Sequence, residues 1–86
     1  MFSKDTPMAQ TKVLSELNAM VWKIEVAAGQ RVAAGDTLIV LEAMKMEIPV
    51  TAPRAGVISA ILITEKQMVA EGETLAVLDS SVADLS

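Results

Sequence analysis

The stretch TLIVLEAMKMEIPVT, residues 37–51, has the pattern of a β-hairpin. Its ends are aliphatic and β-branched runs that favour strands, and they flank the hexapeptide Glu42-Ala43-Met44-Lys45-Met46-Glu47. A tight reversal must lie inside this hexapeptide, yet it contains no Gly, Asn, Asp or Pro, the residues that make reversals easy. Sequences depart from local preferences mainly at functional sites. The departure places Lys45 at a hairpin tip between two methionines.

The rest of the chain reads as short strands separated by frequent turn signals, with no helical period. We predict eight strands, over residues 13–17, 20–26, 31–32, 37–41, 46–51, 57–63, 68–69 and 74–78. Because proline cannot donate a hydrogen bond to a ladder, Pro49 places its strand at a sheet edge or a bulge. The sequence therefore predicts an all-β protein.

The second half of the chain repeats the first. Residues 32–42 match residues 69–79 without a gap, and each residue aligns with the one 37 positions later, as Gly35 does with Gly72. Such a repeat indicates two copies of one structural unit. We expect a flattened eight-strand barrel-sandwich of two four-stranded antiparallel sheets with pseudo-twofold symmetry, each half covering the apolar face of the other. Lys45, at the junction of the copies, is expected near one end of the pseudo-axis and both termini near the other.

Composition predicts how the chain is divided and packed. Its 86 residues suit one domain, which we place at residues 12–79, between a flexible N-terminal segment (1–11) and a polar tail (80–86). Since 52% of the residues are hydrophobic and only 2% are aromatic, Val, Ile, Leu and Met must form the core, with Trp22 buried among them. The four glycines are expected at turns that need a positive φ: Gly29, Gly35, Gly56 and Gly72.

Charge and missing residue types exclude several classes of function. The formal net charge of −4 argues against nucleic acid and against an anionic membrane surface as partners. The chain has no Cys, His or Tyr, which removes disulfides, most metal sites and nucleophile–His arrangements. We therefore expect no catalytic residue, no metal and no enzyme activity of its own. With no apolar run of membrane-spanning length and no signal peptide, a cytoplasmic location is expected.

In this context, the sequence Glu42-Ala43-Met44-Lys45-Met46 resembles the attachment motif of biotinyl domains, the biotin carboxyl carrier family. The resemblance covers roughly residues 13–79, where similar residues stand at Val21-Trp22-Lys23-Ile24, Gly29, Val32, Gly35-Asp36, Leu38, Leu41-Glu42, Ala52-Pro53, Gly56-Val57, Val69, Glu71-Gly72 and Leu75. Family members fold as flattened barrels of two four-stranded sheets with quasi-twofold symmetry, which agrees with the internal repeat.

The resemblance implies that a biotin protein ligase joins biotin to the Lys45 side chain through an amide. Biotin then accepts carboxylate from bicarbonate at a biotin carboxylase, and a carboxyltransferase passes it to an acceptor. For the acceptor, the resemblance favours an acyl-CoA such as acetyl-CoA, because acyl-CoA carboxylases are common in this family; pyruvate and urea are the alternatives. Glu42, Ala43, Met44 and Met46 complete the cofactor-attachment motif. The two methionines either form a soft apolar collar for partner enzymes or pack the hairpin.

Two departures and two rival interpretations accompany the resemblance. Asn18-Ala19 stands where the family often has Pro and Gly, and residues 25–30 leave no room for a protruding thumb, so the chain resembles the thumbless type. A lipoyl carrier domain shares the fold and the hairpin lysine, but its tip typically reads Asp-Lys-Ala, so Met44 and Met46 favour biotin. The other rival is an unmodified barrel that serves as an interaction or adaptor module.

Overall fold

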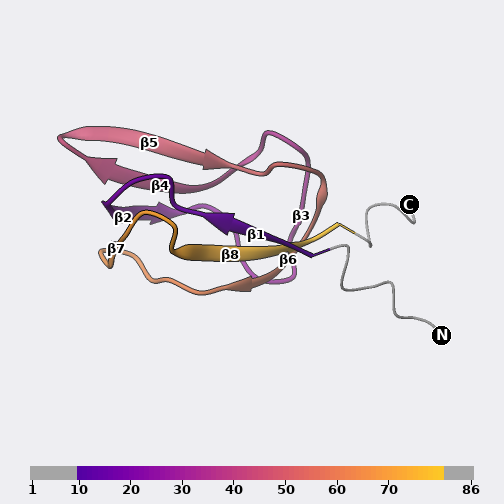
Figure 1. Cartoon of the computed structure of the whole chain (residues 1–86). Helices are drawn as coiled ribbons and strands as arrows, with labels where there is room; N and C mark the ends of the chain where they lie inside the picture. Colours follow the sequence, from indigo (N-terminus) through magenta and orange to yellow (C-terminus); the bar gives the residue numbers. More distant parts are fainter. Residues whose placement is uncertain (1–9, 81–86) are drawn as a thin grey trace.

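The computed structural model describes residues 10–80, which form two four-stranded antiparallel sheets (Figure 1). The strands are β1 (Gln10–Leu14), β2 (Ala19–Ile24), β3 (Arg31–Val32), β4 (Thr37–Ala43), β5 (Met46–Thr51), β6 (Gly56–Ile61), β7 (Met68–Val69) and β8 (Thr74–Asp79). One sheet has the order β1-β8-β6-β3 and the other β5-β4-β2-β7, and the described residues contain no helix. The predicted all-β class and eight-strand, two-sheet architecture are confirmed.

The strands of the two repeats are distributed between the sheets in a way that the sequence did not predict. A shift of 37 residues carries β1 onto β5, β2 onto β6, β3 onto β7 and β4 onto β8. Each sheet contains two strands from each repeat, so the expectation that one half forms a layer covering the other was wrong. The turns repeat as well: the Ala33 amide donates to Asp36 Oδ2 (2.9 Å), and the Ala70 amide donates to Glu73 Oε1 (2.9 Å).

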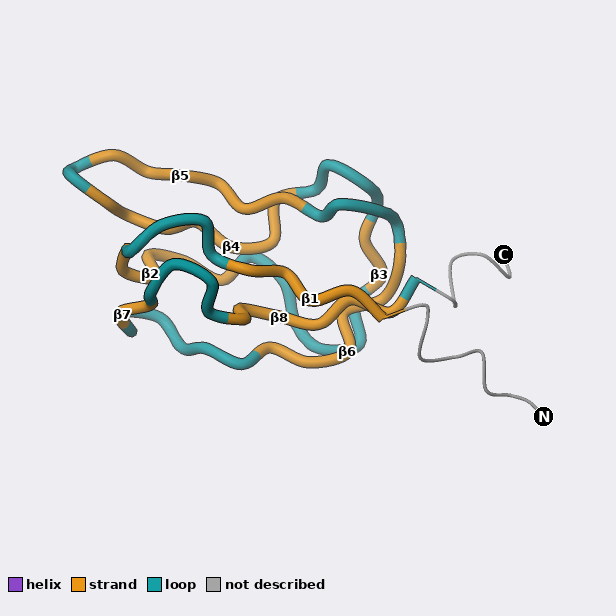
Figure 2. The backbone as a smooth tube through the Cα atoms, in the orientation of Figure 1, coloured by secondary structure: helices purple, strands orange, loops and turns teal. Residues whose placement is uncertain are grey.

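The pseudo-twofold exchanges the β4–β5 hairpin with the antiparallel β8–β1 pair. Figure 2 shows the β4–β5 turn at one end of the molecule and the described start of β1 and end of β8 at the other. These two strand ends are paired through Gln10 and Asp79. The hairpin and the described ends of the chain are therefore opposite, as predicted. The axis passes between them, however, so the prediction that the hairpin lies at an end of this axis was wrong.

The first strand is displaced from its predicted position. β1 covers Gln10–Leu14 rather than residues 13–17, because Ser15 already belongs to a turn. The Ser15 hydroxyl donates to the Leu17 carbonyl (2.6 Å), and its backbone amide donates to the carbonyl of Glu73 (2.9 Å). Of the predicted flexible segment (1–11), residues 1–9 lie outside the described residues, whereas Gln10 and Thr11 belong to β1. Of the predicted tail (80–86), residues 81–86 lie outside the described residues.

The core is aliphatic, as expected, but neither Trp22 nor the methionines build it. Its members are Val13, Ala19, Val21, Val32, Leu38, Ile39, Leu41, Ala52, Ile58, Ile63, Val69, Leu75, Ala76 and Leu78. Trp22 is 47% exposed, which corrects its predicted burial. A bulge between Val21 and Lys23 explains the difference, since it leaves two successive side chains of β2 exposed. Pro49 lies on β5, an edge strand, as its lack of an amide donor predicts.

Gly56 differs from the other three glycines. Gly29, Gly35 and Gly72 have φ angles of 91°, 90° and 86°, as expected for their turns. Gly56 lies in β6 without a positive φ, and a Cβ there would come within 2.6 Å of the Asp79 carbonyl oxygen. Close approach of two backbones, rather than turn geometry, therefore requires this glycine.

We predict that Gly56→Ala lowers the free energy of unfolding by about 1–3 kcal/mol, because the added methyl group meets a backbone atom that cannot rotate away. Urea unfolding monitored by circular dichroism measures the change. An unchanged unfolding midpoint for Gly56→Ala would contradict the close approach.

Candidate functional site

The β4–β5 turn has an unusual backbone for its sequence. Ala43 pairs with Met46 across the hairpin, which leaves Met44 and Lys45 as a two-residue loop. Their φ angles are 53° and 66°, so both residues are left-handed, as a type I′ turn requires. Each such residue other than Gly or Asn costs roughly 1–2 kcal/mol. The hairpin tip therefore stores backbone strain where Asn-Gly would carry none.

The side chains at this tip are displayed rather than packed. Lys45 is exposed, Met44 is 93% exposed and Met46 is 64% exposed. The Lys45 ammonium makes no hydrogen bond or ion pair with the rest of the described chain. Hairpin packing accounts poorly for Met44, since almost none of its surface is covered. The lysine amine stands in solvent, flanked by two flexible apolar side chains.

Glu42 and Glu47 stand opposite each other just behind the tip. They are cross-strand partners in the β4–β5 ladder, so their carboxylates share one face of the sheet. Like charges directly opposite each other destabilise a sheet, and no described residue forms an ion pair with either carboxylate. The structure thus brings all five predicted site residues, Glu42 to Met46, together in one hairpin tip and adds Glu47 to them.

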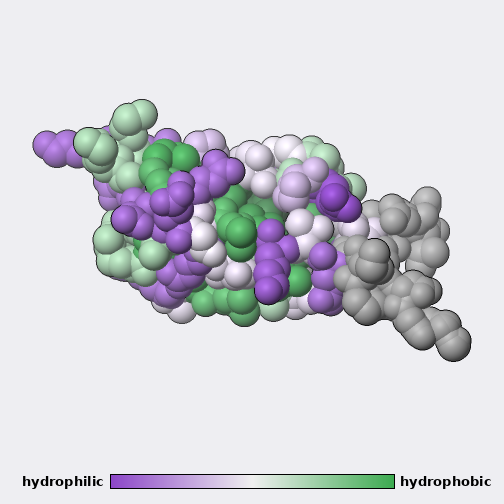
Figure 3. Space-filling view, viewed as in Figure 1, coloured by the Kyte–Doolittle hydropathy of each residue, from purple (hydrophilic) through white to green (hydrophobic). Residues whose placement is uncertain are grey.

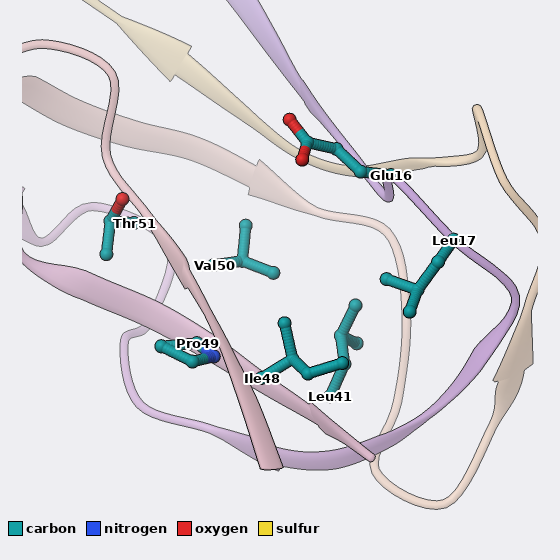
Figure 4. A pocket seen from close by; sticks show the side chains of 7 residues that line it. All are labelled: Glu16, Leu17, Leu41, Ile48, Pro49, Val50 and Thr51. Carbon is teal, nitrogen blue, oxygen red and sulfur yellow. The ribbon is translucent and has the colours of Figure 1, made fainter. Parts of the chain in front are cut away.

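A shallow groove of about 190 Å³ lies on the other face of the hairpin. It is lined by Glu16, Leu17, Leu41, Ile48, Pro49, Val50 and Thr51. In Figure 4 the aliphatic side chains of Leu17, Leu41, Ile48 and Val50 point toward one another, and Glu16 supplies the single carboxylate of the lining. One carboxylate among aliphatic groups offers no acid–base pair.

Other kinds of site find no support in residues 10–80. No group of three or more His, Cys, Asp or Glu side chains in that range is arranged to hold a metal ion. None of its elements is a helix long and apolar enough to cross a membrane.

Comparison with known proteins agrees with this geometry. A family model described as "Biotin-requiring enzyme" of the biotin/lipoyl type matches residues 5–78. The chain belongs to the biotin/lipoyl attachment family. It is 39% identical over 61 residues to the biotin/lipoyl attachment protein of Bacillus subtilis, a match that covers 71% of this chain and 84% of that protein. It is 38% identical over 66 residues to the biotinylated protein TB7.3 homolog of Mycobacterium leprae, covering 77% and 93% of the two chains.

The fold also occurs inside a large carboxylase. A solved single-chain, multi-domain long-chain acyl-CoA carboxylase superposes on 90% of this chain with a TM-score of 0.78 and 28% identity, and the matching part is 8% of that enzyme. Relatives of this chain therefore include biotin carrier domains of carboxylases, and the chain itself is a biotin/lipoyl carrier domain.

We predict that the double variant Met44→Asn/Lys45→Gly raises the free energy of unfolding by about 1–2 kcal/mol, because Asn-Gly relieves the strain of two left-handed residues. Neither side chain makes contacts whose loss would offset the gain. Thermal unfolding of the variant measures the gain, with Lys45→Arg as a control that keeps the strain. A melting temperature equal to or below that of the control would contradict the strained turn.

Proposed function

We propose that this chain is a biotin carboxyl carrier and that Lys45 is the residue that bears biotin. The observation that carries the proposal is the exposed, unpaired Lys45 at the tip of a strained Met-Lys-Met turn, in a chain of the attachment family. The tip fits a covalently attached arm, because nothing in the described structure covers the amine. When attached, biotin supplies the group that holds the transferred carboxylate.

The chain contributes position rather than chemistry. An amine becomes a nucleophile once it has lost its proton, and Lys45 presents its amine at the end of a four-carbon stem. The hairpin root is anchored by Ile39 and Leu41 in the core, so the tip stays fixed relative to the barrel. Tethering the arm to one fixed point raises its effective concentration at two successive enzyme sites.

The partners follow from this proposal. A biotin protein ligase modifies Lys45, a biotin carboxylase loads the carboxylate, and a carboxyltransferase unloads it. An acyl-CoA, with acetyl-CoA as the first choice, is the proposed acceptor; similarity to a long-chain acyl-CoA carboxylase supports this class. The tip sequence Met44-Lys45-Met46 supports biotin over lipoate.

We predict that biotin protein ligase, with biotin and ATP, adds one biotinyl group to this chain and none to Lys45→Arg. Intact-mass spectrometry measures the addition. Lys12→Arg and Lys23→Arg are matched controls, because both lysines are exposed and lie in β1 and β2, outside the hairpin, and each control should gain one group. Modification by a lipoyl ligase with lipoate in place of biotin would favour the lipoyl carrier, and no modification by either ligase would favour the adaptor module.

A further inference from the structure

The shallow groove beside the β4–β5 hairpin has a size and a lining that suit a small ring system. Its volume of about 190 Å³ is below the roughly 300 Å³ at which pockets for drug-sized ligands begin. Leu17, Ile48 and Val50 are partly buried against the core, and in Figure 4 their side chains converge on the hollow. Figure 3 shows dark green, strongly hydrophobic surface between β5 and β1. We call this hollow the hairpin groove.

Glu16 supplies the charged group of the hairpin groove. It is exposed, and its carboxylate makes no hydrogen bond or ion pair with another described residue. A carboxylate accepts hydrogen bonds from N–H donors, and such charge-assisted bonds are stronger than bonds between neutral groups. A ligand that fits this lining is therefore apolar over most of its surface and carries N–H donors at one edge.

The pseudo-twofold shows that the fold alone does not create the groove. The shift of 37 residues relates Leu17 to Arg54, and Lys12 to Pro49. The surface that is equivalent to the groove, at the end of the barrel where β1 begins, therefore contains two exposed basic residues in place of Leu17 and Pro49. Because the strand pairing is the same in both places, the aliphatic lining is a property of the sequence beside the hairpin.

The groove lies within reach of an arm on Lys45 and beyond the reach of the lysine alone. At the rise of a strand, Ile48 is about 10 Å from Lys45 and Val50 is about 17 Å from it. The lysine stem spans about 6 Å from Cα to the amine, whereas a biotinylated side chain spans about 14 Å from Cα to the ring, over roughly eleven bonds. Met46 shares a face of β5 with Ile48 and continues the apolar surface from the tip to the groove.

We propose that the hairpin groove is the resting site of the biotin ring when biotin is attached to Lys45. The inference rests on the proposed function. The sulfur-containing side of the ring and its carbon chain cover the aliphatic lining, and the ureido N–H groups donate to the Glu16 carboxylate. Removal of apolar ring surface from water drives this docking.

Tethering makes a weak site sufficient. A short flexible link gives the ring an effective concentration in the millimolar range at a site that it can reach. A groove that holds the ring with a dissociation constant of about 1 mM is therefore occupied in about half of the molecules. Binding this weak also releases the ring readily to an enzyme site, so the resting position does not oppose transfer.

An extended peptide suits the groove less well than the ring does. A peptide that added a strand to the open edge of β5 would depend on backbone N–H donors there, and Pro49 has none. An acidic peptide would also meet Glu16 as a like charge. The ring, in contrast, needs no backbone donor and brings its own N–H groups.

The test compares methyl NMR spectra of the full chain before and after biotinylation, with one added biotin verified by intact mass. The reporters are the methyl groups of Leu17, Ile48 and Val50, and the reference is Leu62, which follows β6 of the other sheet. We expect biotinylation to shift the three reporters and to leave Leu62 unchanged. Nuclear Overhauser contacts should join the ring protons to the Ile48 and Leu17 methyl groups.

A swap between equivalent positions supplies the matched variants. Leu17→Arg introduces the residue that the repeat carries at the equivalent position, and Arg54→Leu is its control at the opposite end of the barrel. Leu17→Arg should lower the biotin-dependent shift of Ile48 about threefold or more, and Arg54→Leu should leave it unchanged. Glu16→Ala removes the exposed acceptor without touching the core, so it should reduce the same shift even if Leu17→Arg does not fold.

Shift changes confined to Met44, Lys45 and Met46 would overturn the resting site and leave the carrier function intact, since the mass would still show one biotin. Ring contacts that persist unchanged in Leu17→Arg and Glu16→Ala would overturn it as well, because the ring would then rest elsewhere. A chain that accepts no biotin would defeat the proposed function, and the resting site would fall with it, since no arm would reach the groove. The intact mass distinguishes this last result from the other two.

Discussion

The structure depends on the sharing of strands between the two repeats. Each sheet takes two strands from each half of the chain, so neither half can bury its apolar face before the other has folded. Leu38, Ile39 and Leu41 on β4 are fully buried, and β4 lies between β5 and β2. The hairpin that joins the repeats is thus anchored at its root by strands from both halves. The position of the tip is therefore set by the packing of the hairpin root and not by contacts of the tip side chains.

That anchoring explains how the chain sustains a strained turn. The ladder from Thr37–Thr51 to Ala43–Met46 fixes the register, and the two residues left over must both turn left-handed. Residues in sparsely populated conformations persist only where the surrounding structure determines them. Packing of the whole barrel core stabilises the fold enough to offset the strain of these two residues, which costs a few kcal/mol in total. The result is an exposed lysine in a two-residue loop whose ends are both held by the β4–β5 ladder.

The sequence was sufficient to predict the strands, the repeat and the hairpin, because alternation, turn residues and a constant offset are local signals. It predicted Trp22 wrongly, since a bulge changes which face a residue occupies and leaves no mark on composition. It missed the role of Gly56, which depends on the distant Asp79 backbone. Lys66 has a φ of 74° where its equivalent, Gly29, has 91°, so the backbone of the repeat overrides residue preference there. Strand sharing between sheets is likewise a non-local property.

The β4–β5 hairpin and its pseudo-twofold equivalent, the β8–β1 pair, share one pattern of strand pairing, but only β4 and β5 are joined by a tight turn. We propose that the place of Lys45 in the fold selects it for modification. Tandem mass spectrometry of the ligase-treated chain is the decisive experiment, since Lys12, Lys23 and Lys66 are also exposed. We expect biotin on Lys45 in every modified molecule and on no other lysine. Biotin distributed over several of these lysines, or located on one other than Lys45, would contradict it.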